Sequence, residues 1–217
     1  MASTSAEVLT FWFGADEARG RARTEWFRKD DAFDAAIHDR FGALLDEAGR
    51  SVLWRDAAAD ERACADADPD PGAARLDLAR ILVCDQFSRN VWREDPRAFS
   101  LDAVALVHAG ALLANGRHLQ LSLLERWFAY MPFEHAETRA LQALSVSLFE
   151  RLQADADADV DADADGVAGA LASALDFAKR HRDVISRFGR FPHRNAVLGR
   201  TDSEAERVFL AQPGSRF

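Results

Sequence analysis

Several features that define common protein classes are absent from this 217-residue sequence. Its only cysteines, Cys64 and Cys84, lack metal-ligand spacing and predict ordinary thiols, which excludes a disulfide framework. No run of eighteen apolar residues occurs, so no membrane-spanning helix and no membrane partner are expected. The N-terminal stretch MASTSAEVLTFWFG has neither a basic region nor a small-residue cleavage site. We therefore expect no signal peptide and a cytoplasmic protein.

The sequence also lacks the short motifs of common enzyme classes. It contains no phosphate-binding or dinucleotide-binding glycine loop, no G-x-S-x-G and no H-E-x-x-H. The HRD tripeptide at 181–183 matches part of a protein-kinase catalytic loop, but Phe188 stands where that loop requires asparagine. These absences predict no cofactor and no metal, and they leave the oligomeric state open.

The negative charge of the chain is concentrated in one stretch. The formal net charge is −9, and six aspartates lie in ADADADVDADADG (154–166), so the rest of the chain carries −9 + 6 = −3. This balance favours no nucleic-acid partner. Asp161, Asp163, Asp165 and Gly166 match four positions of a calcium-binding EF-hand loop, but Ala172 occupies the position that needs glutamate. We therefore interpret 154–166 as a flexible acidic insertion.

Helical periodicity runs through the sequence, and strand-like alternation is absent. Asp30 or Asp31 is a suitable N-cap for the first long helix, and Gly189 is a suitable residue to end a later one. Pro132 is expected to break one helix and begin the next, and Thr201 with Glu204 forms a capping-box pattern. The predicted helices cover 31–48, 73–92, 96–116, 119–131, 132–153, 167–188 and 201–210. We predict a single all-α domain of antiparallel helical hairpins over residues 1–217, with a loose tail at 211–217.

Cationic groups are gathered in HRDVISRFGRFPHRN (181–195), which carries +3 in an acidic chain. On a helical wheel His181 lies within the apolar face of the 167–188 helix, so its side chain is expected to point inward. Asp183 lies on the opposite face, one turn before Arg187, and predicts a surface ion pair. Arg190, His193 and Arg194 follow the helix end.

Two other predicted helices place ionisable groups on apolar faces. Asp85 and Arg89 lie one turn apart in a helix that is apolar on all sides, and a buried charge is costly unless it is paired. Glu134 and Glu137 continue an apolar stripe at a helix N-terminus, where the helix dipole favours anions. Charge complementarity predicts that Asp85, Glu134 and Glu137 meet Arg89, Arg190 and Arg194.

Several long motifs resemble one protein family along almost the whole chain. They are VLTFWFG (8–14), WFRKD (26–30), LVCDQFSRNVWR (82–93), YMPFEHAE (130–137), FAKRHRDVISRFGRFPHRNAVLGR (177–200) and SEAERVFL (203–210). In these motifs the chain is similar to bacterial domain of unknown function family 924, from about residue 7 to 210. The resemblance implies a tetratricopeptide-like superhelical stack, although the sequence shows no tetratricopeptide repeat. It implies no activity.

The sequence departs from the family pattern at three positions. Cys84 and Ser88 stand where the family usually has leucine and proline, and Ala136 stands where it usually has serine. If that serine were catalytic, this chain would be inactive.

Three functions fit these residues. The first is binding of a small anion or a peptide carboxylate by a polar pocket, because arginine forks recognise carboxylate and phosphate. The second is a hydrolase that uses His181 or His193 as a base beside Glu134. The third is a protein-interaction scaffold in which the polar cluster is a structural ion-pair network. The candidate ligand-binding residues are Asp85, Arg89, Asn90, Glu134, His135, Glu137, His181, Arg182, Arg190, His193, Arg194 and Asn195.

Overall fold

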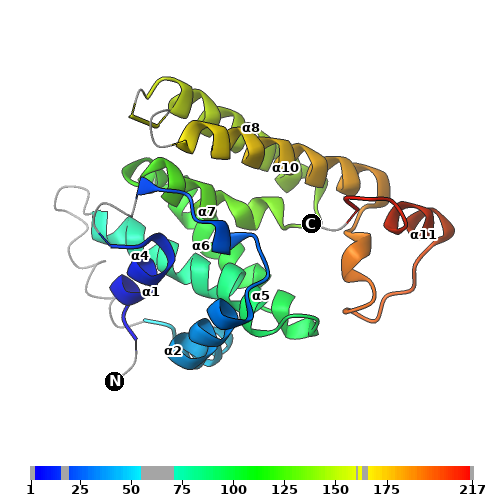
Figure 1. Cartoon of the computed structure of the whole chain (residues 1–217), viewed down its shortest axis with the longest axis horizontal. Coiled ribbons are helices and arrows are strands. Elements are labelled where there is room, and N and C mark those ends of the chain that lie inside the picture. Colours follow the sequence, from blue (N-terminus) through cyan, green and yellow to red (C-terminus); the bar gives the residue numbers. More distant parts are fainter. Residues whose placement is uncertain (1–2, 16–19, 55–70, 160, 163–165, 216–217) are drawn as a thin grey trace.

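The chain folds into packed helices, as predicted. The computed structural model describes residues 3–15, 20–54, 71–159, 161–162 and 166–215, and these ranges contain helices and no strand (Figure 1). The α-helices are α1 (Ser5–Phe13), α2 (Asp31–Gly49), α4 (Pro71–Ile81), α5 (Ser88–Val91), α6 (Asp102–Ala114), α7 (Leu123–Glu134), α8 (Arg139–Asp157), α10 (Val167–Phe188) and α11 (Glu204–Leu210). Short 3₁₀ helices are η2 (Thr24–Trp26), η4 (Pro96–Phe99), η5 (Arg117–Gln120) and η6 (Pro192–Arg194).

Neighbouring helices pack as antiparallel pairs around one main core. In Figure 1, α8 and α10 lie side by side, α7 runs beneath them, and α11 lies at the far end of α10. Aromatic residues fill the centre of the core, where Trp12, Phe41, Phe87 and Phe128 are almost wholly buried. A smaller apolar cluster of Val184, Ile185 and Phe191, with Phe188 and Phe209, attaches the C-terminal segment (residues 189–203) and α11 to α10.

Helix ends follow the local signals in two predicted places. The Asp30 carboxylate accepts hydrogen bonds from the backbone N–H groups of Ala32 and Phe33, so Asp30 caps α2. Gly189 ends α10 with φ +72°, a left-handed conformation that costs glycine little. The inward direction of His181 is also confirmed, because its side chain is buried.

Several predicted helix boundaries are wrong. The predicted 96–116 helix is η4 followed by α6 from Asp102, and the predicted 119–131 helix begins only at Leu123. Pro132 does not break its helix, because α7 continues through it to Glu134, and the next helix begins only at Arg139. The last helix is capped by Ser203 with Glu206, whereas Thr201 lies before the helix. Thr201 with Glu204 and Ser203 with Glu206 both have capping-box spacing. Ser203 is the residue that caps α11, and its partner Glu206 also accepts a hydrogen bond from Arg190.

Parts of the acidic stretch (154–166) and of the C-terminal tail (211–217) are more ordered than the sequence predicts. α8 extends to Asp157, so the first residues of the predicted insertion are helical. The tail bends back onto the fold, where Gly214 O accepts a hydrogen bond of 2.9 Å from Arg180 Nη2 and Ser215 is buried. Cys64 and the central EF-hand-like positions Asp163 and Asp165 lie outside the described residues.

The predicted helix at 73–92 contains a π-helical turn, η3 (Leu82–Phe87), between α4 and α5. The N–H of Ser88 donates to Val83 O, five residues back, as a widened turn requires. The Ser88 hydroxyl donates to Cys84 O at 2.7 Å and to Ala98 O at 3.1 Å, which links the turn to η4. Every residue of η3 is buried, including Asp85. Such turns are frequent at functional sites, so η3 directs attention to Asp85.

One described stretch, Pro96–Ala114, is long and apolar enough to cross a membrane by length and composition. A stretch can therefore be apolar enough on average to cross a membrane even where no run of eighteen apolar residues occurs. It is not one continuous α-helix, because η4 ends at Phe99 and α6 begins at Asp102. Asp102 also forms ion pairs with Arg89 and Arg194, and α6 packs between α4 and α7. These are the contacts of a helix within the folded domain.

Candidate functional site

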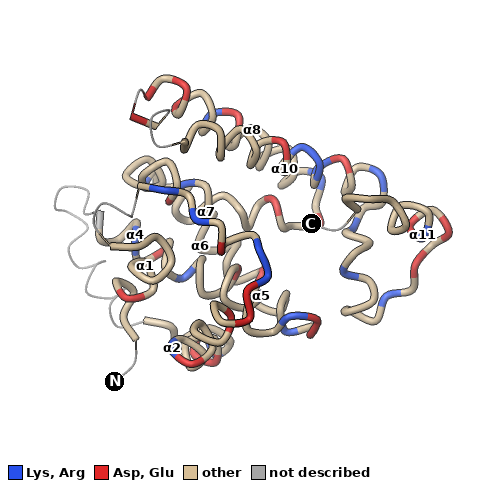
Figure 2. The backbone as a smooth tube through the Cα atoms, viewed as in Figure 1, with Lys and Arg blue, Asp and Glu red and all other residues tan. Residues whose placement is uncertain are grey.

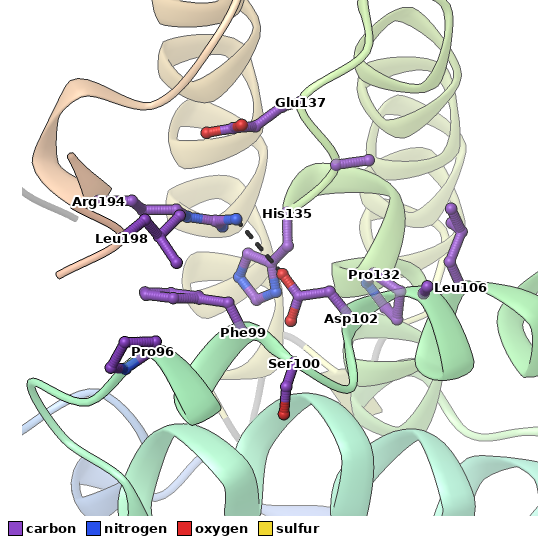
Figure 3. Close-up of a pocket in the computed structure, with 12 residues that line it drawn as sticks. Pro96, Phe99, Ser100, Asp102, Leu106, Pro132, His135, Glu137, Arg194 and Leu198 are labelled. Carbon is purple, nitrogen blue, oxygen red and sulfur yellow. Dashed lines mark hydrogen bonds and ion pairs between the residues drawn. The ribbon is translucent and has the colours of Figure 1, made fainter. Parts of the chain in front are cut away.

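A cavity of about 350 Å³ opens where η4, α6, the end of α7 and the C-terminal segment meet (Figure 3). Its apolar walls come from Pro96, Phe99, Leu106, Pro132 and Leu198, and its ionisable lining residues are Asp102, His135, Glu137 and Arg194. Helix α6, the α7 end and η6 are far apart in sequence. The site therefore exists only in the packed fold, with apolar surface beside charged groups.

Asp85, which is fully buried, pairs with His135, which lines the cavity. His135 Nδ1 lies 2.8 Å from Asp85 Oδ1, while Gln86 Nε2 donates to Oδ2 at 2.6 Å. Arg89 Nη1 lies 3.2 Å from Oδ1. Burial of Asp85 opposes ionisation, but the charge of Arg89 and the hydrogen bond from His135 outweigh it and lower the pKa of Asp85. Asp85 is thus an ionised carboxylate that fixes the orientation of His135.

Asp102 lies between two guanidinium groups. Its Oδ1 is 3.0 Å from Arg89 Nη2, and its Oδ2 is 3.3 Å from Arg194 Nη1. Burial, aided by the nearby charge of Asp85, raises the pKa of Asp102 even though both arginines oppose the change. The two aspartates therefore differ in environment, and protons bind more readily at Asp102 than at Asp85.

Arg194 is a buried cation with spare hydrogen-bonding capacity. Only 6% of the residue is exposed, and its guanidinium lies over the rings of Phe99 (4.7 Å) and Phe191 (4.6 Å). Its Nε is buried without a hydrogen-bond partner in the described part of the chain. Burial and the charge of Arg89 lower the pKa of Arg194 to about 10, so it stays charged at neutral pH. A buried donor without an acceptor is costly, which suggests that a further acceptor binds here.

Glu137 closes the upper side of the cavity, but with a different partner from those predicted. Arg200 donates to it at 2.7 and 3.0 Å, and the Phe191 N–H donates at 2.7 Å. Burial would raise the pKa of Glu137, but these hydrogen bonds lower it. The prediction grouped Glu137 with Arg89, Arg190 and Arg194 without naming pairs, and Glu137 does lie in the cavity with Arg194. Its hydrogen bonds come instead from Arg200, which folds back onto it from the end of the C-terminal segment.

Glu134 and His181 pair with each other behind the cavity. His181 Nδ1 lies 2.9 Å from Glu134 Oε1 and 2.9 Å from Phe177 O. Both side chains are buried, and neither lines the cavity. This pair joins α7 to α10 and gives the expected core histidine a polar partner.

Arg190 binds α11 and not the site. Its Nε and Nη2 donate to the Glu206 carboxylate at 2.7 and 2.8 Å, and Nη2 also donates to Thr201 O. The Arg190 hydrogen bonds lower the pKa of Glu206. The predicted pairing of Arg190 with a central carboxylate is therefore wrong, because the carboxylate of α11 is nearer.

Other candidates lie outside the cavity. Asn90 donates to Asp34 of α2, and Asn195 donates to Asp202 within the C-terminal segment. Arg182 pairs with Asp183 on the surface of α10, which replaces the predicted Asp183–Arg187 pair. Arg187 instead lies over the Phe188 ring at 4.6 Å. Figure 2 shows acidic and basic residues interspersed from α10 to α11, so the +3 stretch is not a single cationic patch.

Several residues of the site escaped the sequence analysis, among them Asp102, Arg200 and Phe99. Asp102 lies in the first turn of α6, where an acidic residue is ordinary, so its position gave no signal. Arg200 lies within the family-like motif but beyond the stretch that we singled out. Including both gives three carboxylates (Asp85, Asp102, Glu137) and three guanidinium groups (Arg89, Arg194, Arg200) around the cavity. The three negative charges of the carboxylates equal the three positive charges of the guanidinium groups.

His193 makes the fold sensitive to mild acid. Burial, and then the charges of Arg194, His181 and His135, lower its pKa to about 3, although Glu137 opposes this. Below pH 6.5 the unfolded chain binds a proton at His193 that the folded chain does not, so stability falls with pH. We expect His193→Gln to reduce the loss of unfolding free energy between pH 6.5 and 5.0 by about 2 kcal/mol. Urea denaturation at both pH values measures this.

The pH window separates His193 from the two glutamates of the C-terminal contacts, Glu137 and Glu206. Glu137 and Glu206, whose pKa values are lowered, begin to contribute only near and below pH 4.5. His118→Gln is a comparison and not a neutral control. Burial also lowers the pKa of His118, which lies near Tyr130 and away from the cavity, so this change should shift the pH dependence in the same direction. An equal pH dependence in wild type and His193→Gln would contradict the prediction.

The described residues contain no group of three or more His, Cys, Asp or Glu side chains arranged to hold a metal ion. The ionisable groups of the cavity are instead joined into acid–base pairs. The arrangement can therefore bind a polar group beside an apolar wall, with His135 among the lining residues.

Comparisons with known proteins relate the chain to proteins whose function is not assigned. A family model described as "Bacterial protein of unknown function (DUF924)" matches residues 8–214. A solved structure of a protein of unknown function from Agrobacterium tumefaciens is 31% identical, with a TM-score of 0.72. The match covers 95% of this chain and 96% of that one. A comparison with curated proteins found no match.

Proposed function

Because this chain belongs to the bacterial family of unknown function DUF924, membership of which implies no activity, we propose a function from its cavity: the binding of a small organic carboxylate. Arg194 carries the proposal. It lines the cavity, it is buried, and its Nε has no hydrogen-bond partner among the described residues. A carboxylate supplies the acceptor that this guanidinium lacks, and hydrogen bonds between charged groups are stronger than those between neutral ones.

The shape and lining of the cavity define the ligand further. Phe99, Leu106 and Leu198 offer apolar surface beside the charged groups, which suits a carboxylate with a short hydrocarbon body. The volume of about 350 Å³ suits a small molecule better than a folded peptide segment. Asp102 does not oppose such a ligand strongly, because Arg89 also neutralises it.

The sequence-based hydrolase hypothesis placed the base at His181 or His193 beside Glu134. Neither histidine nor Glu134 lines the cavity, so a ligand bound there has no direct access to them. The scaffold hypothesis, with the charged cluster as a purely structural network, is the alternative that the binding experiment must eliminate. The tetratricopeptide-like stacking of the hairpins belongs with that alternative and also stays a prediction.

Calorimetric titration tests the proposal. We expect butyrate, phenylacetate or octanoate to bind, and the matched neutral amide to bind at least about tenfold more weakly. Arg194→Met should weaken carboxylate binding by about 10- to 100-fold, because a charged hydrogen bond contributes about 1.5–3 kcal/mol. Arg187→Met, which alters an exposed arginine of α10, is the matched control and should bind as wild type.

Two outcomes would contradict the proposal: no carboxylate of the panel binds, or Arg194→Met binds with wild-type affinity. Thermal unfolding of each variant establishes that it is folded. If Arg194→Met does not fold, Arg194→Lys keeps the charge but loses the planar fork, and its affinity should still fall.

A further inference from the structure

We propose that His135 is a general base that hydrolyses an ester or amide bond of the carboxylate bound in the cavity, with Asp85 as its positioning residue. This inference rests on the proposed function and adds a reaction to it. It differs from the sequence-based hydrolase hypothesis because the base, its partner and the position of the substrate all change.

The two ring nitrogens of His135 have different surroundings. Nδ1 lies 2.8 Å from an oxygen of Asp85, and an ionised carboxylate can only accept, so Nδ1 carries the proton. In a neutral imidazole Nε2 is then the acceptor. Among the described residues none forms a hydrogen bond with Nε2, and His135 lines the cavity beside Arg194 (Figure 3). The basic nitrogen is therefore the one left for a ligand or a water molecule.

Asp85 is held rigidly enough to position the ring. It is fully buried, and Gln86, Arg89 and His135 surround its two oxygens. The π-helical turn η3 determines where its side chain leaves the helix. A buried carboxylate that orients the histidine by its Nδ1–H is the supporting half of an acid–base pair.

No described side chain that lines the cavity is available as a nucleophile, so the nucleophile is water. Ser100 is the one hydroxyl-bearing side chain among the lining residues, and its Oγ donates to Arg97 O at 2.8 Å. Cys84 does not line the cavity, and burial raises the pKa of its thiol to about 12, so it is inert as a nucleophile. His135 therefore acts on a water molecule and not on a protein nucleophile.

The reaction needs no co-reactant besides water. A water oxygen bonds to the acyl carbon while His135 Nε2 takes one water proton, giving a tetrahedral intermediate. The bond from the acyl carbon to the leaving oxygen or nitrogen then breaks with its electron pair, and that atom receives the proton from Nε2. The products are a carboxylic acid and an alcohol or amine. Arg194 holds the distal carboxylate, so acidic acyl substrates are preferred over neutral ones.

The mono-4-nitrophenyl ester of adipic acid is a suitable probe, with 4-nitrophenyl hexanoate as its neutral counterpart. We expect wild type to hydrolyse the adipate ester above the buffer rate, with kcat/KM at least about tenfold higher than for the hexanoate. His135→Gln should lower kcat by about 100-fold or more. Calorimetry should show adipate binding to His135→Gln with nearly wild-type affinity. His38→Gln, an exposed histidine of α2, is the matched control.

Asp85→Asn provides a second readout. An amide keeps the size of the side chain but can present its N–H to His135, which disfavours the required tautomer. We expect kcat to fall while KM for the adipate ester stays near wild type, whereas a merely structural role would raise KM by distorting the cavity.

The outcomes separate the two proposals. If adipate binds but its ester is not hydrolysed above the buffer rate, the catalytic inference is wrong and the proposed function stands. If adipate does not bind and its ester is not hydrolysed, both fail. Hydrolysis that survives in His135→Gln eliminates His135 as the base.

Discussion

Replacing Asp85 by alanine is expected to lower the free energy of unfolding by about 3–5 kcal/mol, because removal of one partner leaves other buried polar groups unsatisfied. The carboxylate is fully buried and is bonded by His135 and Gln86, with Arg89 beside it. Arg89 would keep one carboxylate partner, Asp102, so the loss should fall short of that for a wholly isolated charge. Urea denaturation at pH 7.5 gives the difference.

The matched control for Asp85 is Asp183, which also pairs with an arginine but on the surface. Asp183→Ala should change stability by less than about 0.5 kcal/mol, because exposed ion pairs contribute little. If Asp85→Ala were as stable as Asp183→Ala, the Asp85 network would be unimportant for the fold.

Trp12→Ala should cost a similar amount, about 3–5 kcal/mol, for a different reason. The Trp12 ring is fully buried and lies within 6.2 Å, centroid to centroid, of the rings of Trp26, Phe33, Phe87 and Phe128. Truncation therefore removes apolar surface from the core and leaves a cavity among rigid rings that cannot collapse easily. Denaturant unfolding followed by circular dichroism measures the loss.

A graded series makes this prediction specific to packing. Trp12→Phe should cost less than Trp12→Ala, because a ring still fills part of the space and the indole N–H has no described hydrogen-bond partner to lose. Val208→Ala, at an exposed position of α11, should be nearly neutral. Equal losses for Trp12→Phe and Trp12→Ala would show that the cavity is not the cause.

Helix positions could be predicted because they depend on local periodicity and caps. The wheel placed His181 inward, and Asp30 and Gly189 marked helix ends, since each of these signals acts within a few residues. The sequence could not predict η3, because a π-helical turn changes the phase of a helix without any distinctive residue. It also failed at Pro132, where the packed helix continues despite the missing N–H.

The partners of the charged residues in the site were harder to predict than which residues belong to the site. Asp85 and Arg89 pair as expected because they are four residues apart on one helix. Arg194 meets Asp102, which is 92 residues away, and Arg200 meets Glu137, which is 63 residues away. Helix packing alone determines such distant partners, so charge complementarity named the right residue types and often the wrong partner.

The contact between Arg194 and Asp102 also has a thermodynamic consequence. Arg194 belongs to the C-terminal segment, which is attached to the preceding helices by the Phe191 cluster and by the Arg200–Glu137 pair. The cavity therefore lacks Arg194 and Leu198 whenever this segment is detached from the helices. A ligand held by Arg194 binds the attached form alone and must favour it by RT ln(1 + [L]/Kd). Occupancy of the cavity and attachment of the chain end are thus one coupled equilibrium.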